Sequence, residues 1–350
     1  MVMSASASQP PVVFIATSAG GHIDLMVALR TAFDGYRRVW VVQPSLRAEV
    51  LAREGEEVIV LPDYDRHPLR GHYLGNLARA AGIVLRQRPQ VVVTSGAGAT
   101  VPFCLLARIF GARVVFVETM ARVTGPSSSG RVLSRLASRV LVQWSEAARF
   151  YPRAVVCRPA LLQSVGTAER GPGEGVFVGV GTHIQPFDRL LETVDRAAGN
   201  GVLPRPIVAQ GGPSKYEPRN YELRAWLAPE EVHEAIAGAE YVICHAGSGL
   251  MSGALRAGRR PLVLPRLAAH GEHFDDHQTQ IVAKLAALGL VVPIGDEITE
   301  ADLAAARTPV RAPEEWERAP IVADAVRAQL EAALGRPAAL APISTEGRIA

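Results

Sequence analysis

The sequence predicts an α/β protein in which two doubly wound parallel sheets face a central cleft. Short runs rich in Val and Ile alternate with stretches whose apolar residues recur at helical spacing. That pattern is typical of parallel strands covered by helices on both faces. The alternation occurs once before residue 163 and again after residue 175, and a chain of 350 residues is long enough for two such domains.

The first alternation predicts an N-terminal domain over residues 11–162. Helices are expected at 24–33 and 73–86, where apolar residues fall on one helical face. The β-branched runs predict strands at 12–16, 39–43, 58–61, 91–94, 114–117 and 140–142.

A segment rich in Gly, Ser and Thr at 163–175 predicts a linker, after which the alternation restarts. We expect a C-terminal domain over 176–335 that closes with a helix at 316–334, followed by a flexible tail at 336–350. The strands expected in this domain are 176–180, 207–209, 241–244, 262–264 and 291–293.

Composition narrows the class of protein. The three cysteines are scattered among apolar residues, which favours a reducing compartment over a disulfide framework. No apolar run approaches the ~20 residues of a membrane span, and the first residues lack the pattern of a signal peptide. We therefore expect a cytoplasmic protein.

Charge is distributed unevenly along the chain. Residues 1–165 hold 19 Arg against 10 acidic residues, whereas the remainder holds 18 basic against 24 acidic residues. A basic half favours anionic lipid headgroups or diphosphates as partners. The chain lacks the interleaved aromatic and basic residues of single-strand nucleic-acid binders, so nucleic acid is not expected.

Three glycine-rich loops each follow an apolar run: SAGGH at 18–22, GVGTH at 179–183 and HAGSG at 245–249. A glycine loop that opens a helix presents free backbone N–H groups and the positive end of the helix dipole. A phosphate or diphosphate is the ligand that suits this arrangement. The alternative is tight strand–helix packing without a ligand, which is less favoured for three loops than for one.

His22 follows Gly20-Gly21 at the head of the first expected helix, so its side chain is expected at the cleft. A histidine there can act as a general base near neutral pH. The alternative is a hydrogen bond from its imidazole to the local backbone.

A polar cluster follows Pro265: His270, His273, Asp275, Asp276 and His277. Its spacing allows a metal site. The segment has no cysteine and no second ligand cluster, so hydrogen bonding of Asp276, His277 and the next residue, Gln278, to a polyhydroxyl ligand is favoured and no metal is predicted.

These motifs together resemble a known family. HAGSG…ALRAGRRPLVLPR…GEHFDDHQ, with GVGTH…FDRLL, resembles the C-terminal domain of family 28 glycosyltransferases, and the GEHxxDHQ form is most similar to bacterial exopolysaccharide relatives. SAGGH, VVVTSGAG and FVETMARVTGPSSSGRVLSRLASRVLVQW resemble the acceptor-binding, membrane-recruiting partner subunit of the two-subunit UDP-GlcNAc transferase that acts on dolichol-diphosphate-GlcNAc. The resemblance covers roughly residues 11–335, with both halves fused in one chain.

The resemblance implies a GT-B fold and metal-independent, inverting transfer without a cofactor. The donor would be a UDP-sugar, and the acceptor a polyprenyl-diphosphate-linked saccharide in exopolysaccharide or cell-surface glycan synthesis. The enzyme would be peripherally associated with the cytoplasmic face of the membrane. The donor sugar, the acceptor sugar and the linkage stay open.

The resemblance also implies roles for individual residues. His22 is favoured as the base, and Glu118 is the runner-up. The implied donor-binding residues are Gly181, Thr182, His245, Ala246, Gly247, Ser248, Gly249, His273, Asp276, His277 and Gln278. The implied acceptor-binding residues are Gly20, Gly21, Ser95, Gly96 and Arg122.

The sequence departs from the family pattern in two places. Gly253 stands where family 28 members often carry an acidic residue for the ribose diol. The partner subunit commonly has an N-terminal membrane anchor, which this sequence lacks, so attachment through the basic half is expected, with 74–88 as the candidate segment. The alternative for 74–88 is an ordinary helix that covers the sheet.

Two rival functions use the same fold. A UDP-sugar 2-epimerase would act on the nucleotide sugar without any acceptor. A non-catalytic lipid-docking subunit would not need the HAGSG and DHQ motifs, so the presence of both halves argues against it.

Overall fold

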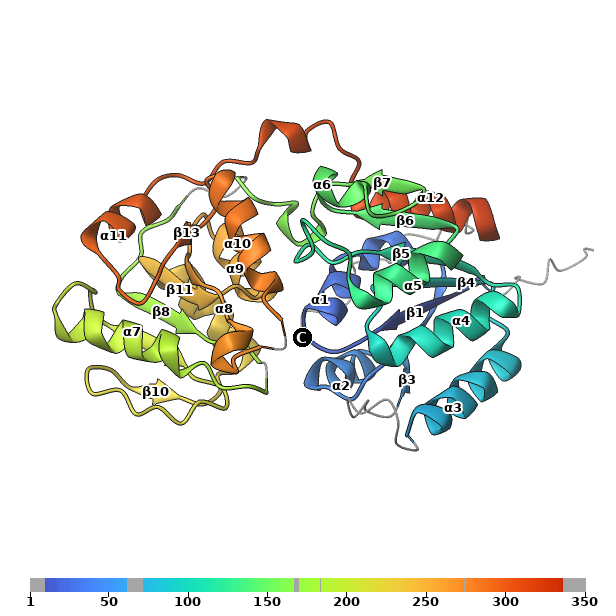
Figure 1. The fold of residues 1–350 in the computed structure, drawn as a ribbon, viewed down its shortest axis with the longest axis horizontal. Coiled ribbons are helices and arrows are strands. Elements are labelled where there is room, and N and C mark those ends of the chain that lie inside the picture. The colour runs from blue at the N-terminus through green and yellow to red at the C-terminus, as the bar shows by residue number, and fades with distance from the viewer. Residues whose placement is uncertain (1–9, 62–71, 167–169, 183, 274, 336–350) are drawn as a thin grey trace, which may run out of the picture.

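The computed structural model describes residues 10–61, 72–166, 170–182, 184–273 and 275–335. The expected tail at 336–350 and residues 167–169 of the expected linker lie outside the described residues. The two halves of the chain lie side by side, and each holds one parallel sheet (Figure 1).

The N-terminal sheet has seven parallel strands in the order β3-β2-β1-β4-β5-β6-β7. Successive residues of β1 face opposite layers: Val13 and Ile15 pack in one buried cluster, and Phe14 and Ala16 in the other. The strands are β1 (Val12–Thr17), β2 (Arg37–Val42), β3 (Glu57–Val60), β4 (Val91–Thr94), β5 (Arg113–Val117), β6 (Arg139–Val142) and β7 (Ala154–Val156).

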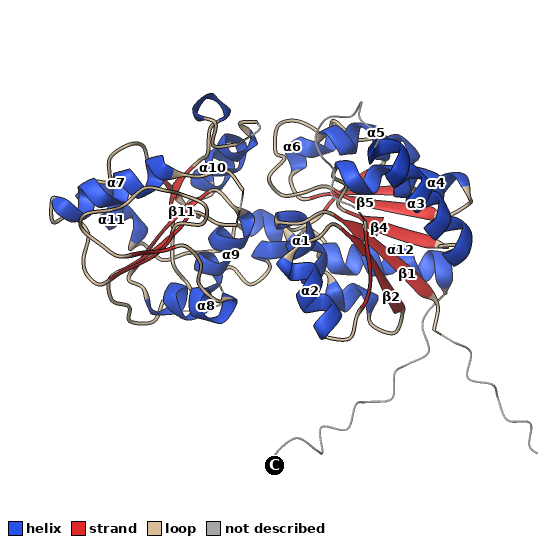
Figure 2. Cartoon of the chain, turned by 90° about the horizontal axis from the view of Figure 1, so that it is seen from below, coloured by secondary structure: helices blue, strands red, loops and turns tan. Residues whose placement is uncertain are grey.

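Helices cover both faces of this sheet (Figure 2). Side-chain caps set two of their starts, because Ser45 Oγ accepts from Ala48 N and Ser127 Oγ accepts from Gly130 N. The α-helices of this half are α1 (Gly21–Ala28), α2 (Leu46–Arg53), α3 (His72–Gln87), α4 (Val101–Ile109), α5 (Ser128–Leu136) and α6 (Ser145–Ala148). Its short 3₁₀ helices are η1 (Arg30–Phe33), η2 (Gly98–Thr100) and η3 (Ala160–Leu162).

The C-terminal sheet has six parallel strands in the order β10-β9-β8-β11-β12-β13. They are β8 (Val176–Gly179), β9 (Ile207–Gln210), β10 (Leu223–Arg224), β11 (Tyr241–His245), β12 (Leu262–Leu264) and β13 (Val292–Pro293). The helices that accompany this sheet are α7 (Asp188–Gly199), α8 (Pro229–Gly238), α9 (Ser248–Arg256), η4 (Ala268–His270), α10 (His277–Ala287) and α11 (Glu300–Ala306).

The end of the described chain returns to the N-terminal half. After η5 (Glu314–Trp316), helix α12 (Val322–Leu334) packs Val322, Val326 and Leu330 into the cluster that contains Val13 and Ile15 of β1 (Figure 1). The predicted C-terminal domain over 176–335 includes this helix, whereas in the structure the helix packs on the N-terminal sheet. Local periodicity identifies the helix but carries no information about which sheet it covers.

The predicted fold class is confirmed: the described chain is α/β with two doubly wound parallel sheets. Every expected strand is present, and the edge strands β7 and β10 are additional. Among the described helices, none combines the length and apolar character that crossing a bilayer requires.

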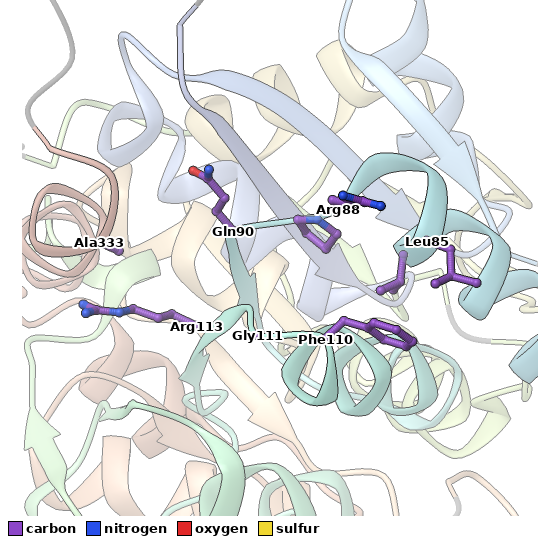
Figure 3. A pocket seen from close by; sticks show the side chains of 9 residues that line it. Leu85, Arg88, Gln90, Phe110, Gly111, Arg113 and Ala333 are labelled. Carbon is purple, nitrogen blue, oxygen red and sulfur yellow. The ribbon is translucent and has the colours of Figure 1, made fainter.

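A groove of about 640 Å³ lies at the amino ends of β4 and β5 (Figure 3). Its lining combines apolar Leu85 and Phe110 with the guanidinium-bearing Arg88 and Arg113. This is the edge of the sheet opposite the carboxyl ends of its strands, so the groove is separate from the loops that the sequence singled out.

Candidate functional site

The strand order places the predicted loops at equivalent points of the two sheets. The order reverses between β1 and β4 in one sheet and between β8 and β11 in the other. Ligands of doubly wound sheets bind at such switch points, beyond the carboxyl ends of the strands. SAGGH follows β1, VVVTSGAG runs through β4, GVGTH follows β8, and HAGSG begins in β11.

The loops of the two halves touch. A β-carbon on Gly21 would lie 2.7 Å from Ser248 Oγ, so the serine side chain would have to shift to admit one. One turn further along α1, Asp24 Oδ2 lies 3.7 Å from the position that a Gly249 β-carbon would take. The N-terminus of α1 therefore faces the N-terminus of α9 across the junction.

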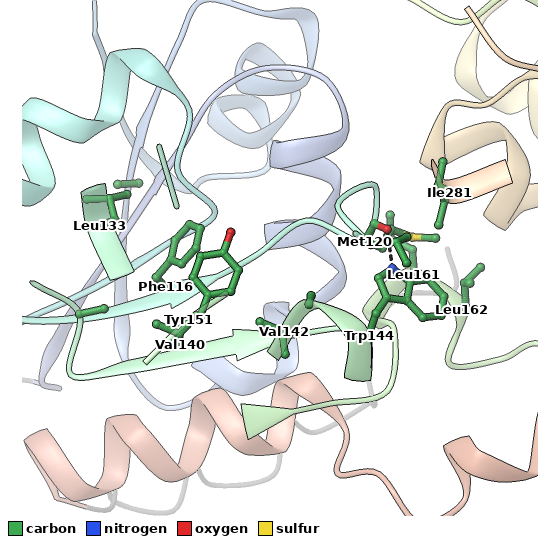
Figure 4. Packing of buried hydrophobic residues seen from close by; sticks show 14 of the residues in the cluster. Phe116, Met120, Leu133, Val140, Val142, Trp144, Tyr151, Leu161, Leu162 and Ile281 are labelled. Carbon is green, nitrogen blue, oxygen red and sulfur yellow. Dashed lines mark hydrogen bonds between the residues drawn. The ribbon is translucent and has the colours of Figure 1, made fainter. Parts of the chain in front are cut away.

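Behind this junction the halves share an apolar core. Met120, Trp144 and Leu162 of the N-terminal half belong to the same buried cluster as Ile281 of α10 and Met251 of α9. Figure 4 shows Ile281 reaching toward Met120, with the Trp144 indole N–H donating to the Met120 carbonyl at 2.6 Å. This packing holds the two sets of loops against each other.

The α9 N-terminus is suited to an anion. Gly247 occupies the N-cap and provides no side-chain hydrogen bond, so the first N–H groups of the helix have no intrahelical acceptor. The helix dipole adds partial positive charge at this end. Gly249 is exposed there, which leaves the backbone accessible to a diphosphate.

His245 joins the two loops of the C-terminal half. Its buried imidazole lies so close to Gly181 and Gly247 that a β-carbon on either would overlap the ring. Gly181 also has a φ of +77°, which favours glycine. His245 is thus a packing contact that aligns the two loops, with Ala246 buried beside it and Thr182 exposed at the loop surface.

A buried arginine that the sequence interpretation missed holds the same loops. Arg266 is fully buried, and its Nη1 donates to the carbonyls of Gln185, Pro186 and Glu272 at 2.9, 3.0 and 3.1 Å. Its Nη2 donates to the Val180 carbonyl at 2.8 Å, on the residue before Gly181. Burial lowers the pKa of Arg266 to about 10, so the guanidinium stays charged at neutral pH.

The ion pair between Arg189 and Glu272 holds the segment to which Arg266 donates. Arg189 of α7 donates to both carboxylate oxygens of Glu272, at 2.9 and 2.8 Å, and Glu272 accepts from Leu267 N. Because charged hydrogen bonds of this kind are strong and directional, the segment between β12 and α10 is held in one conformation. The only sequence signal for this network is an Arg that closely follows the apolar run of β12.

His22 lies at the N-terminus of α1 and is half-buried. Burial lowers its pKa to about 4, although hydrogen bonding with the Ser95 backbone acts in the opposite direction. The imidazole is therefore neutral at pH 7. Its Nδ1 is inaccessible to solvent and has no hydrogen-bond partner among the described residues.

Glu118, the other candidate base, is 1% exposed and fully engaged. Its carboxylate accepts hydrogen bonds from Thr119 N at 2.9 Å, from Ser127 N at 3.1 Å and from the Tyr151 hydroxyl. This geometry gives Glu118 the task of shaping the loop that carries Arg122. Both of its carboxylate oxygens are engaged by donors of the N-terminal half.

Arg122, one of the implied acceptor-binding residues, reaches across to the C-terminal half. Its Nη2 donates to Asp275 Oδ2 at 2.6 Å. Asp275 Oδ1 in turn contacts His277 Nδ1 and lies 3.3 Å from His273 Nδ1. Burial acts to raise the pKa of Asp275, but hydrogen bonds from His277 and Arg122 hold it below its ordinary value.

The remaining implied residues divide into exposed and structural positions. Gly20 is exposed beside His22, and Asp276 is exposed while its Oδ1 accepts from Ala268 N. Gln278 is buried, with its Oε1 accepting from Arg266 N at 3.0 Å. Ser95 is also buried, bonded to Thr17 at 2.8 Å.

Gly96 and Gly253 both lie close to neighbouring side chains. Gly96, next to Ser95, packs against Ser129, which its β-carbon would meet at 2.5 Å. A β-carbon on Gly253 would approach Ile236 of α8 at 3.3 Å, so this position packs within the C-terminal half.

Replacing Arg266 by Met should weaken UDP binding about tenfold or more, equivalent to about 1.4 kcal/mol. Without the guanidinium, the Val180 carbonyl is released and the N–H groups of the adjacent loop lose their fixed direction. Uridine lacks the diphosphate, so calorimetry should show that the variant binds uridine with an affinity within about threefold of that of the unsubstituted protein. Arg307→Met, an exposed arginine of the same half, is the matched control. Equal UDP affinity in both folded variants would contradict this role.

Two family models match the chain in succession. The model described as oligosaccharide biosynthesis protein Alg14 like matches residues 72–158, and the model described as glycosyltransferase family 28 C-terminal domain matches residues 176–316. This is the order that the resemblance predicted for the two halves, so the predicted resemblance is confirmed.

Complete proteins match over most of their length. A curated protein of Burkholderia lata is 30% identical over 335 residues, which are 86% of this chain and 87% of that protein. Its name is UDP-N-acetylglucosamine--N-acetylmuramyl-(pentapeptide) pyrophosphoryl-undecaprenol N-acetylglucosamine transferase.

Solved structures match with lower sequence identity. MurG of Acinetobacter baumannii superimposes with a TM-score of 0.59 at 17% identity, over 91% of this chain and 99% of that one. The UDP-GlcNAc 2-epimerase of Methanocaldococcus jannaschii gives 0.57 at 13% identity, over 84% and 91%. At these identities the structural likeness establishes the shared fold and does not separate a transferase from an epimerase.

The sequence relationship distinguishes a transferase from an epimerase. Identity of 30% extends across both halves of a named transferase, and the family 28 model covers the half with the glycine-opened α9. The chain therefore belongs to glycosyltransferase family 28 and is a glycosyltransferase with the GT-B fold.

Proposed function

We propose that this enzyme transfers a sugar from a UDP-sugar to a saccharide carried on polyprenyl diphosphate, with inversion and without a metal ion. The observation that carries the proposal is the uncapped N-terminus of α9, which lies against the N-terminus of α1 with His22 one residue beyond their contact. UDP-GlcNAc is the first donor to consider, because the Burkholderia lata relative is named for it.

The chemistry follows from the positions of these groups. His22 accepts the proton of the acceptor hydroxyl, and that oxygen attacks the anomeric carbon from the face opposite UDP. The bond to the UDP oxygen breaks, and the diphosphate takes the electron pair. The N–H groups at 181–182 and 247–249 stabilise this charge, because they are fixed before the reaction begins.

The donor sugar would lie beside the segment between β12 and α10. Asp276 is exposed at the start of α10, and His273 and His277 are half-buried next to it. Gln278 uses its Oε1 to hold the Arg266 backbone, which leaves its amide nitrogen as the group available to the sugar. Hydroxyl groups of a hexose suit these donors and acceptors.

The acceptor lipid requires a membrane surface, and the N-terminal half offers a candidate. Exposed apolar side chains gather where α3, α4 and α5 pack side by side, including Ile109 at 75% and Phe110 at 58% exposure. We define this α3–α5 patch by Leu85, Ile109, Phe110, Val132 and Leu136. Arg86, Arg88, Arg108, Arg113, Arg131 and Arg135 lie in or next to the same elements.

An apolar patch on elements that also carry arginine favours docking to anionic lipid. Helix α3 also covers the sheet through Ala80 and Val84, so covering the sheet and facing the membrane are compatible. The enzyme would then work at the cytoplasmic face of the membrane, in exopolysaccharide or other cell-surface glycan synthesis.

A transfer assay tests the proposal directly. Incubation with radiolabelled UDP-GlcNAc and a short-chain polyprenyl-diphosphate saccharide should give a labelled lipid. NMR of this product should show that the transferred sugar has the opposite anomeric configuration to the donor. Acceptors with and without N-acetylmuramyl-pentapeptide distinguish peptidoglycan from exopolysaccharide synthesis. The label should transfer equally in EDTA. Conversion of UDP-GlcNAc to an epimer without acceptor, or activity lost in EDTA and restored by Mn²⁺, would contradict the proposal.

Replacing His22 by Ala should lower kcat by about 10²–10⁴-fold, while UDP affinity stays within about twofold. Because the pKa of His22 is lowered to about 4, the neutral base predominates at higher pH. The rate of the unsubstituted enzyme should therefore stay level from about pH 6 to 8 and fall only as the pH approaches 4. A variant with nearly full kcat would exclude His22 as the base.

Glu118→Gln separates the two candidate bases. An amide cannot accept all three hydrogen bonds of the carboxylate, so we expect a lower melting temperature. If kcat of the folded variant fell as far as in His22→Ala without any loss of stability, Glu118 would be the base.

Replacing Ile109 and Phe110 by Asp should reduce binding to vesicles that contain anionic phospholipid by at least about tenfold, because the patch loses apolar area and gains negative charge. Co-sedimentation measures the bound fraction. Trp226→Asp, at an exposed apolar side chain of the C-terminal half, is the control and should bind as before. Equal losses in both variants would contradict a role specific to the α3–α5 patch.

A further inference from the structure

Three side chains before and at the start of α10 converge on one point. Among the described residues, His273, Asp275 and His277 form a group whose ligand atoms all lie within 4.8 Å of one another. They alternate along the chain, and the turn into α10 brings them to the same side. The two imidazole rings meet edge to face at 4.7 Å between centroids.

The carboxylate of Asp275 divides its two oxygens between different partners. Oδ1 contacts His277 Nδ1 and lies 3.3 Å from His273 Nδ1. Oδ2 accepts from Arg122 of the other half at 2.6 Å. One oxygen is thus shared by the two imidazoles, and the other is held from outside the cluster.

We propose that His273, Asp275 and His277 form a site for a divalent transition-metal ion of the zinc type. Two imidazoles and a carboxylate, with a fourth position left to water, are a ligand set that zinc uses. Metal–ligand distances near 2.0–2.1 Å in a tetrahedron place ligand atoms about 3.3 Å apart. His273 Nδ1 and Asp275 Oδ1 have this separation, 3.3 Å, whereas His277 Nδ1 lies closer to Asp275 Oδ1 and would have to move apart from it.

Two further features fit an ion and define what must move. Two hydrogen bonds have to open: the one between His277 Nδ1 and Asp275 Oδ1, where the metal takes the place of the shared proton, and the one that Asp275 N donates to His273 Nδ1 at 3.4 Å. The Arg122 guanidinium can stay on Oδ2, since a ligating carboxylate commonly keeps a hydrogen bond on its other oxygen. All three side chains are half-buried, which limits but does not prevent access from solvent.

This site goes beyond the proposed sugar transfer, in which backbone N–H groups carry the charge of the leaving diphosphate and no metal takes part. Zinc binding can therefore be measured without any substrate. Because His273 and His277 also lie beside the proposed donor sugar, zinc and the sugar would compete for these side chains. Zinc binding that fails without substrate would leave the transfer proposal intact, and transfer that fails would leave the zinc titration unaffected.

The test is a titration of the purified, chelator-treated full chain with Zn²⁺ against a chromophoric competitor. The structure predicts one equivalent of zinc, and Co²⁺ in its place should give the visible absorption of a tetrahedral site. His273→Ala and His277→Ala should each weaken binding by at least about tenfold. Asp275→Asn should do the same while keeping the size of the side chain.

His270→Ala and His233→Ala are the matched controls, because both residues are exposed and lie outside the group. Both should bind one equivalent with unchanged affinity, and circular dichroism confirms folding of every variant. No binding by the unsubstituted chain, or equal affinity in His273→Ala, His277→Ala and the controls, would overturn the proposal.

Discussion

The site depends on the reversal of strand order in two parallel sheets. At each reversal the chain leaves neighbouring strands in opposite directions, which opens a crevice that no connection crosses. In this protein the reversals fall at β1/β4 and β8/β11, and the glycine-rich loops begin there. The halves then meet so closely that a β-carbon on Gly21 would lie 2.7 Å from Ser248 Oγ. Backbone N–H groups and one neutral histidine are thereby brought to a shared location.

Such an arrangement needs rigid loops, and a buried charge supplies the rigidity. Removing a guanidinium from water is unfavourable unless its hydrogen bonds are satisfied. Arg266 Nη1 and Nη2 donate to four backbone carbonyls, which ties Val180, beside Gly181, to the segment around Glu272. The shared apolar core around Trp144 and Ile281 holds the two halves against each other. Packing fixes the distance between the loops, and polar contacts fix their direction.

The sequence predicted what local patterns can determine. Buried strands such as Val91–Thr94 are continuous apolar runs, and glycine loops after them are visible in the same way. The short edge strands β7 and β10 were missed because half-exposed residues weaken the apolar pattern. The position of α12 on the N-terminal sheet and the carbonyl partners of Arg266 depend on contacts between distant residues. No spacing rule predicts such contacts. Glu118 was located correctly as a special position, but its burial and three donors became evident only in three dimensions.

A crystal structure of the enzyme with UDP tests the central claim most directly. The diphosphate oxygens should lie within hydrogen-bond distance, about 2.7–3.2 Å, of backbone nitrogens at 247–249 and 181–182, with no metal bridging them. UDP held at another surface, or a diphosphate whose charge is met by side chains or a metal ion and not by these nitrogens, would contradict it.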